Sequence, residues 1–208
     1  MKLIDRNFDV LNNSNQLETL QIIKNFPVFM GTVNHDNKQD LTAEMSWVIS
    51  KKTGMIQLNK LIPLDILYKN SHESGVIGKL WDDHHSSFCR FIENYKHDQI
   101  IEIGGGNGIL ANKFHKNNPK VKWTIVDPNS KPIKGSKAKY INKFYNENLD
   151  IDYRNSTIVH SHTLEHVYEP LKFMDLISKN IKKNRLIFSV PNIKEMVKRK
   201  YTNAINFE

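Results

Sequence analysis

The chain has 208 residues, of which 39% are hydrophobic and 25% are charged, so at about 150 residues per domain it forms one large domain or one domain with an appendage. Its single cysteine, Cys89, excludes an intramolecular disulfide and a cysteine-rich zinc module. No apolar run approaches the ~18 residues of a transmembrane helix, and the N-terminus lacks the apolar core of a signal peptide. We therefore expect a cytoplasmic protein with no membrane partner.

The net charge of +8 raises the question of nucleic-acid binding. Only 5 of the 30 basic residues are arginine, the residue that base readout and bidentate phosphate recognition favour. We therefore expect no nucleic-acid partner. The basic surface would still attract a small anionic substrate, and the sequence leaves the oligomeric state open.

The first half of the chain has a mixed pattern. Residues 8–26 carry apolar positions at a patchy helical spacing, and residues 78–95 show a clearer helical stripe that His84 and His85 interrupt. Short segments with strand character lie between them, at 27–33, 46–50 and 55–58. We predict that residues 1–97 form a helical N-terminal cap that helps to bind the substrate.

From residue 98 onward, apolar strands alternate with amphipathic helices. Strands are predicted in the segments 99–103, 121–128, 139–144, 156–162 and 185–191, with helices at 109–117 and 171–183. This alternation is typical of a doubly wound, mostly parallel sheet with crossover helices. We therefore predict an α/β, Rossmann-like core over residues 98–208.

The strongest sequence signal is a glycine cluster directly after the first strand of this core. The segment 100–108 reads IIEIGGGNG. Glycine lets the backbone turn sharply and approach a ligand, and such a turn lies at the carboxyl edge of an open α/β sheet. A dinucleotide-binding GxGxxG motif would need glycine where Ile109 stands. The GxGxG spacing, with Glu102 two residues before it, therefore departs from that motif.

A second signal is a carboxylate at the end of the next predicted strand. Asp127 follows the glycine at position 104 by 23 residues and precedes Pro128. A carboxylate at this place can accept both hydroxyls of a ribose. An Asp before Pro also forms turns on its own, but the fold would bring this one to the edge that carries the glycine cluster, which favours the ribose role.

Together, these residues resemble motif I and the ribose-binding acid of class I S-adenosylmethionine-dependent methyltransferases, over about residues 98–192. The resemblance implies S-adenosylmethionine as the cofactor. It implies that Glu102 faces the methionine amino group or orders the loop, and that Tyr145 lies near the adenine. The remaining cofactor-binding residues that it implies are Gly104, Gly105, Gly106, Gly108, Asp127, Pro128, His160, Ser161 and His162.

Further segments resemble bacterial methyltransferases that act on sugars and sugar nucleotides. Residues 164–170 look like their LEH…P segment, and 189–192 like their VPN segment. In sugar C-methyltransferases a Tyr and a His precede motif I. The corresponding residues of this chain are Tyr68 and His72. Those relatives carry a four-cysteine zinc module that this chain lacks, and the 16 residues after 192 are too few for the last two strands of a seven-stranded sheet. We expect the C-terminal strands to be truncated.

The expected chemistry is O-methylation with a histidine as general base, because the pKa of histidine suits proton removal near neutral pH. His162, Glu165 and His166 follow the fourth predicted strand of the core and are the main catalytic candidates, with His72 and Tyr68 implied by the resemblance. His84 and His85 are adjacent on a helix, so at most one faces a site. Metal chelation by His162, Glu165 and His166 is an alternative that their spacing allows, but the HExxH pattern is missing and we expect no metal.

The sequence thus predicts a methyltransferase for a sugar, a nucleotide-linked sugar or a phosphorylated precursor of bacterial capsule or surface polysaccharide. Two alternatives stay open. One is an NAD-dependent oxidoreductase, which Ile109 disfavours. The other is a cofactor-binding partner subunit without activity of its own.

Overall fold

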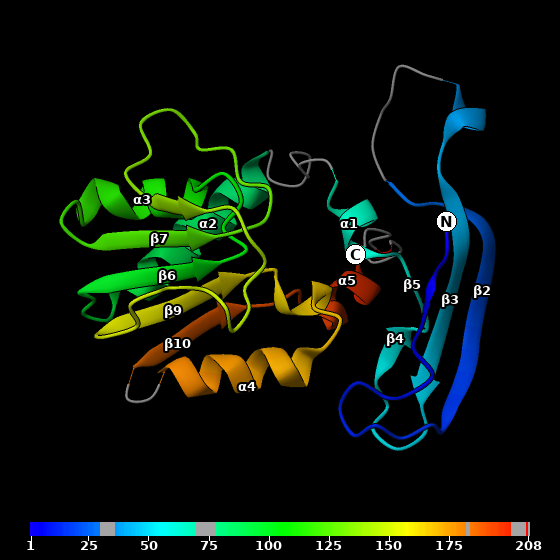
Figure 1. Ribbon diagram of the computed structural model, residues 1–208. Coiled ribbons are helices and arrows are strands. Elements are labelled where there is room, and N and C mark those ends of the chain that lie inside the picture. Colours follow the sequence, from blue (N-terminus) through cyan, green and yellow to red (C-terminus); the bar gives the residue numbers. More distant parts are fainter. Residues whose placement is uncertain (30–35, 70–77, 182–183, 201–206, 208) are drawn as a thin grey trace. The chain divides into compact units, whose positions relative to one another are not determined.

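The computed structural model of the chain describes residues 1–29, 36–69, 78–181, 184–200 and 207 (Figure 1). The chain divides into two compact units. The first comprises residues 1–70, 169–171 and 192–208, and the second residues 71–168 and 172–191. The second unit begins well before residue 98, so the helix that precedes the alternating pattern belongs with the parallel sheet.

The first unit is built on antiparallel strands. A three-stranded sheet has the order β2-β3-β4, and a two-stranded sheet pairs β1 with β5. Its apolar core includes Met45, Val48 and Leu67. The elements of this unit are β1 (Ile4–Asp5), β2 (Leu17–Pro27), a 3-10 turn (Asn37–Gln39), β3 (Thr42–Ser50), β4 (Ile56–Leu58), β5 (Lys60–Leu61), α1 (Leu64–Leu67) and α5 (Ile193–Lys198).

The prediction of a helical N-terminal cap is wrong. The second half of the segment predicted as helical forms β2, an eleven-residue strand, and the only α-helix among the described residues of 1–69 is the four-residue α1. The register between β2 and β3 shifts between Thr19 and Gln21 and again between Ile23 and Phe26. Each shift inserts an extra residue into β2, so its apolar residues do not follow the two-residue period of a regular strand. The strands predicted at 46–50 and 55–58 are confirmed by β3 and β4.

The second unit contains a five-stranded parallel sheet with the order β10-β9-β6-β7-β8. Its elements are α2 (Lys79–Glu93), β6 (Gln99–Ile103), α3 (Ile109–Asn117), β7 (Lys122–Val126), β8 (Lys139–Ile141), β9 (Ser156–Ser161), a 3-10 turn η3 (Leu164–His166), α4 (Pro170–Ile181) and β10 (Arg185–Ser189). The predicted α/β, Rossmann-like parallel sheet is confirmed. Among the residues described after β10, none forms a further strand.

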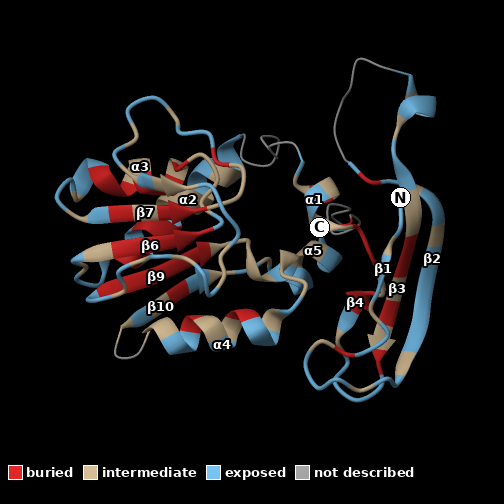
Figure 2. Cartoon of the chain, in the orientation of Figure 1, coloured by how far each residue is buried: buried red, intermediate tan, exposed pale blue. Residues whose placement is uncertain are grey.

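Helices cover both faces of this sheet, and the sheet between them is largely buried (Figure 2). On one face, α2 and α3 pack Phe88, Ile92 and Phe114 against the strands. On the other face, α4 contributes Phe173 and Ile177 to a second apolar cluster. Because both faces are covered, the strands read in the sequence as nearly continuous apolar runs, which made them easy to predict.

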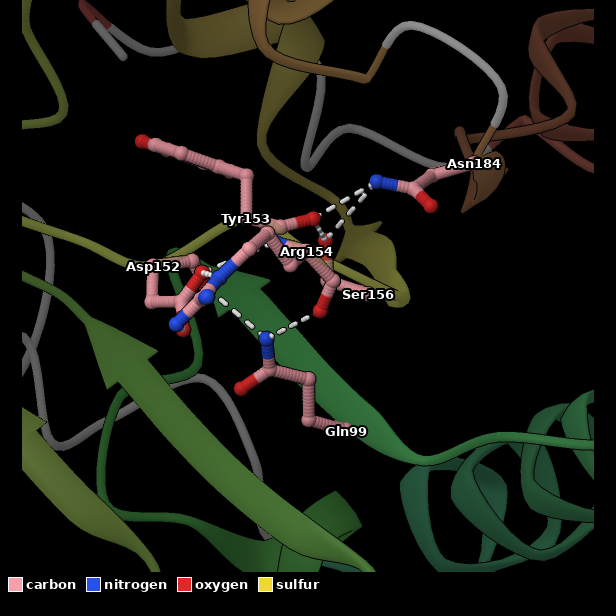
Figure 3. A network of polar contacts seen from close by, with 6 residues as sticks. All are labelled: Gln99, Asp152, Tyr153, Arg154, Ser156 and Asn184. Carbon is pink, nitrogen blue, oxygen red and sulfur yellow. Dashed lines mark hydrogen bonds and ion pairs between the residues drawn. The ribbon is translucent and has the colours of Figure 1, made fainter.

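Side-chain hydrogen bonds fix the amino ends of the central strands (Figure 3). The Gln99 amide at the start of β6 donates to the backbone carbonyls of Asp152 and Arg154, at 2.8 and 2.7 Å. The Asn184 amide, just before β10, donates to the carbonyl of Tyr153 at 2.6 Å. These contacts tie the segment before β9 to its neighbours, and so help to set where the opposite, carboxyl ends of the strands lie.

Over the described ranges, no helix has the length and apolar character needed to cross a membrane.

Candidate functional site

The carboxyl ends of the parallel strands form one edge of the sheet in the second unit. Ile103 at the end of β6 is in register with Val126 of β7 and with His160 of β9. The chain leaves β6 toward β7 and β8 on one side, and later returns to add β9 and β10 on the other. The strand order therefore reverses between β6 and β9, and ligands of open α/β sheets bind at such a switch point.

The glycine loop crosses the end of β6 at this point. Gly104, Gly106 and Gly108 have φ values of +71°, +52° and +84°, in the left-handed region that side chains with a Cβ rarely adopt. A Cβ at Gly104 would lie 2.5 Å from Thr163 Oγ1, whereas a Cβ at Gly106 would meet nothing within 4 Å. The loop is thus closely packed at its start and open above Gly106.

Asp127 connects the end of β7 to this loop. Its Oδ2 accepts a hydrogen bond of 3.0 Å from the backbone N–H of Gly106, and its Oδ1 accepts one of 2.9 Å from the N–H of Asn129. Each carboxylate oxygen can accept a further hydrogen bond. The half-buried Asp127 and Pro128 therefore lie beside the loop, as the sequence predicts.

Glu102 lies beneath the loop rather than at its surface. It is 3% exposed, and its Oε2 accepts a hydrogen bond of 2.8 Å from Trp123 Nε1. Burial and, to a smaller extent, the charge of Asp127 raise the pKa of Glu102 to about 7, although the hydrogen bond from Trp123 lowers it. A Cβ at Gly105 would lie 2.6 Å from the Glu102 carboxyl carbon, so this carboxyl group supports the loop from below.

The predicted catalytic residues after β9 lie together. His162 Nδ1 is 3.3 Å from Glu165 Oε1, and His166 Nε2 is 3.9 Å from the same oxygen. Burial raises the pKa of Glu165, but the hydrogen bond from His162 and the neighbouring imidazoles outweigh burial and lower it. A carboxylate at this distance favours the tautomer of His162 that carries its N–H on Nδ1.

Helix α2 brings Trp81 and His84 to this group, where the sequence predicted only that at most one of His84 and His85 faces a site. His84 Nε2 lies 2.9 Å from Ser161 Oγ, and that hydroxyl lies 2.8 Å from Ser189 Oγ at the end of β10. The His162 ring makes edge contacts with Trp81 and His84, with ring centroids 5.0 and 4.9 Å apart. The signal was available, because Trp81, His84 and Phe88 are spaced as one face of a helix.

The remaining predicted site residues are His160, Tyr145, Tyr68 and His72. The His160 ring is fully buried on the α4 face, stacked on Phe188 at 5.0 Å, and neither ring nitrogen has a hydrogen-bond partner among the described residues. The Tyr145 hydroxyl accepts a hydrogen bond of 3.0 Å from Asn180 of α4. Tyr68 lies in the first unit at the end of α1, and His72 lies outside the described residues.

Among the residues that the structure describes, no group of three or more His, Cys, Asp or Glu side chains could hold a metal ion. His162, Glu165 and His166 interact with each other instead.

Comparisons with solved structures find the methyltransferase BpumL, at low similarity. The complex described as "plantazolicin methyltransferase BpumL in complex with SAH" is 14% identical, with a TM-score of 0.41 over 54% of this chain and 46% of that one. The complex with a pentazolic desmethylPZN analog and SAH is also 14% identical, with a TM-score of 0.44 over 60% and 55%. The chain spans about half the length of the structures it matches.

No curated protein sequence matches the chain. The protein family described as "Methyltransferase domain" matches residues 80–204, which is more than half of the chain. The match includes the glycine loop, Asp127, the histidines that follow β9 and most of α2. The chain therefore belongs to the methyltransferase-domain family.

Proposed function

We propose that the chain is an S-adenosylmethionine-dependent methyltransferase that methylates a hydroxyl group of a sugar-containing small molecule. The observation that carries this proposal is the contact between the glycine loop and Asp127. The carboxylate is bound to the Gly106 N–H at 3.0 Å, at the switch point of the sheet and beside open space above Gly106.

The residues at this edge fit an adenosyl sulfonium cofactor. Asp127 keeps acceptor capacity for ribose hydroxyls, and the space above Gly106 would be filled by any larger side chain. The Asp127 carboxylate lies beside the loop, which suits a ligand that carries a positive charge, whereas the buried Glu102 supports the loop from below. When bound, the cofactor supplies an activated methyl group on a positively charged sulfur. The protein's own task is then to position the acceptor and take its proton.

His162 is the residue best arranged to take that proton. Its Nδ1 is held by Glu165, and its ring lies against Trp81 and His84 of α2. A base whose orientation is fixed by a carboxylate follows the logic of the Ser-His-Asp triad, in which the acid orients the imidazole and stabilises its charged form. Here the proton would move from the acceptor hydroxyl to His162 Nε2.

The groups around His162 favour an acceptor that is uncharged where it is methylated. Burial, with the nearby His162 and His85, lowers the pKa of His84 to about 4, so its ring is neutral at pH 7. Two lysines of α2 and α3 are paired with α2 carboxylates, Lys113 with Asp82 and Lys79 with Asp83, both at 2.7 Å. Neutral imidazoles and the Ser161 and Ser189 hydroxyls suit the hydroxyl groups of a sugar ring.

The acceptor class rests on the sugar-methyltransferase resemblance of the LEH and VPN segments together with this uncharged lining. We propose a sugar, a nucleotide-linked sugar or a phosphorylated precursor of bacterial capsule or surface polysaccharide. The net charge of +8 would favour the approach of an anionic acceptor.

A methyl-transfer screen tests the proposal. The full chain is incubated with S-adenosylmethionine and a panel of free hexoses, hexose 1-phosphates and UDP-hexoses, and mass spectrometry detects the methylated product. We expect transfer to at least one member. The His162→Ala variant is expected to lose about 100-fold or more in turnover, the scale of general-base catalysis, with its S-adenosylhomocysteine affinity within twofold of wild type.

His85→Gln is the matched control, because His85 Nδ1 already bonds the Trp81 carbonyl of its own helix at 2.7 Å. We expect it to keep its turnover. A fully active His162→Ala variant would remove His162 as the base. Tight cofactor binding without transfer to any acceptor would favour a partner subunit without activity.

A further inference from the structure

The backbone of His162 has an unusual conformation. Its φ is +50°, in the left-handed region, where a residue with a Cβ is sterically disfavoured. Such a conformation persists only where surrounding contacts hold it, and it occurs preferentially at functional sites. The contacts that hold His162 therefore decide where its imidazole points.

A chain of hydrogen bonds leads from His162 to helix α2. The His162 N–H donates to the backbone carbonyl of Ser189 at 3.0 Å. The Ser189 hydroxyl bonds the Ser161 hydroxyl at 2.8 Å, and the latter bonds His84 Nε2 at 2.9 Å. Ser161 directly precedes His162, and Ser189 accepts the hydrogen bond from the His162 N–H. Both serines are thus linked to His84, which lies on helix α2.

The His84 ring is itself fixed in place. It stacks on Phe88 one helical turn later, with an interplanar angle of 13° and centroids 6.0 Å apart, and it contacts the edge of the His162 ring. The titratable groups that face the two imidazoles are His85 of α2, and Glu165 and His166 of the turn after β9. Since His84 is neutral at pH 7, it does not repel a proton that His162 takes up.

We propose that His84 is a positioning residue for the base: through Ser161 and Ser189, it holds His162 in the left-handed conformation that directs its imidazole toward the methyl acceptor. The direction toward an acceptor rests on the proposed function. The effect of His84 on the conformation of His162 does not rest on the proposed function, and it can be measured without any acceptor.

Two substitutions of His84 separate the hydrogen bond from ring packing. His84→Gln keeps a nitrogen at the position of Nε2 and loses the ring. His84→Phe keeps the ring and its contacts with Phe88 and His162, and loses the hydrogen bond to Ser161. Ser161→Ala and Ser189→Ala each delete one hydroxyl from the chain without changing either ring.

Nuclear magnetic resonance of the full chain with labelled histidine provides the measurement. Two quantities report on His162: its three-bond HN–Hα coupling, which depends on φ, and the nuclear Overhauser effect between its ring and the Trp81 indole, whose centroids are 5.0 Å apart. His162→Ala identifies the His162 signals. Ser86→Ala is the matched control, because it deletes an α2 hydroxyl that bonds the Asp82 carbonyl instead.

We expect His84→Phe, Ser161→Ala and Ser189→Ala to change the coupling and to weaken the Overhauser effect at least twofold. His84→Gln and Ser86→Ala should resemble wild type. In any acceptor assay that gives turnover, His84→Phe should lower kcat at least tenfold with KM within twofold, and His84→Gln should restore kcat.

Unchanged His162 signals in the three variants without the hydrogen-bond chain would overturn the proposal, as would His84→Gln behaving like His84→Phe. If His84→Phe fails to fold, the two serine variants still decide. Binding of S-adenosylhomocysteine is measured separately by calorimetry, so failure of the positioning role and failure of the proposed function give different results.

Discussion

At the scale of single residues, Gly106 has a backbone held by Asp127 and open space where a side chain would lie, and a cofactor-binding loop needs both. Its backbone is in the left-handed region at φ +52°, and its N–H is bound by Asp127, while the space a side chain would take is open. A substitution there would change the loop surface without disturbing packed neighbours. The loop's function can therefore be tested apart from its stability.

We predict that Gly106→Arg weakens S-adenosylhomocysteine binding at least 100-fold, because the new side chain would fill the open space above the loop. The left-handed backbone adds a strain of about 1–2 kcal/mol. Isothermal calorimetry measures the affinity, and thermal unfolding verifies the fold. Gly54→Arg is the matched control, since Gly54 also has a positive φ, +74°, with nothing within 4 Å of an added Cβ. Unchanged affinity in Gly106→Arg would count against the loop assignment.

Glu102 makes stability depend on pH in a direction that can be calculated. The unfolded chain releases this proton near pH 4.5, whereas the folded chain keeps it until about pH 7. Between these values the folded state binds more protons, so the contribution of Glu102 to stability falls as pH rises. The burial of the carboxyl under the loop is the cause.

The Glu102→Gln variant cannot lose a proton and should escape this effect. We predict that its free energy of unfolding, relative to wild type, is about 2–3 kcal/mol larger at pH 8 than at pH 5, which means that the variant is relatively more stable at the higher pH. Urea unfolding at both pH values measures the difference, and subtraction of wild type removes the shared contribution of other groups. A difference that does not vary with pH would show that Glu102 is not held protonated by the fold.

The sequence predicted the residues that act through the backbone or a strand end better than those that act from a helix. Gly106 and Asp127 lie in a local pattern, so their meeting follows from the topology of the sheet. The helical spacing of His84 with Trp81 and Phe88 is visible in the sequence, but the contact of His84 with Ser161, 77 residues away, is not. His160 has the polar character of a site residue, but the alternation of β9 places its side chain on the α4 face.

At the scale of elements, helix α3 begins where the glycine loop ends. Gly108 is its N-cap, with φ +84°, and the Tyr140 hydroxyl of β8 is packed against the place a Cβ would take. That hydroxyl also donates to the Asn107 carbonyl at 3.1 Å. The start of α3, the loop and β8 are therefore packed as one structure.

We predict that Gly108→Ala lowers the free energy of unfolding by about 1–3 kcal/mol more than Gly78→Ala, because overpacking is added to backbone strain. Gly78 is the matched control: it is the N-cap of α2, also with a positive φ, and has no neighbour within 4 Å of an added Cβ. Urea unfolding gives both values. Adding Tyr140→Phe to Gly108→Ala should recover part of the loss, and equal effects of the two alanine variants would contradict this packing.

The elements of the second unit were predicted closely, whereas in the first unit the strands β3 and β4 were predicted and β2 was not. Helix α3 was predicted with its observed bounds, since a glycine cap, an apolar stripe and neighbouring strands all agreed. Strand β2 was predicted as helical because Leu17, Leu20 and Ile23 are three residues apart. The irregularities of β2 produce that spacing, and the positive φ of Asn25, +54°, lies within the second of them.

At the scale of the whole molecule, the strand order of the second unit determines which residues meet at the edge of its sheet. A parallel sheet with the order β10-β9-β6-β7-β8 brings the ends of β6, β7 and β9 to one edge. There the glycine loop meets Asp127, and His162 meets Glu165. The same topology also occurs in nicotinamide-binding folds. The identity of the cofactor therefore separates a methyltransferase from an NAD-dependent oxidoreductase.

Isothermal calorimetry of the full chain with S-adenosylhomocysteine and, separately, with NAD tests this point most directly. We predict saturable binding of S-adenosylhomocysteine, with one molecule per chain, and no binding of NAD. Binding of NAD without binding of S-adenosylhomocysteine would contradict this prediction.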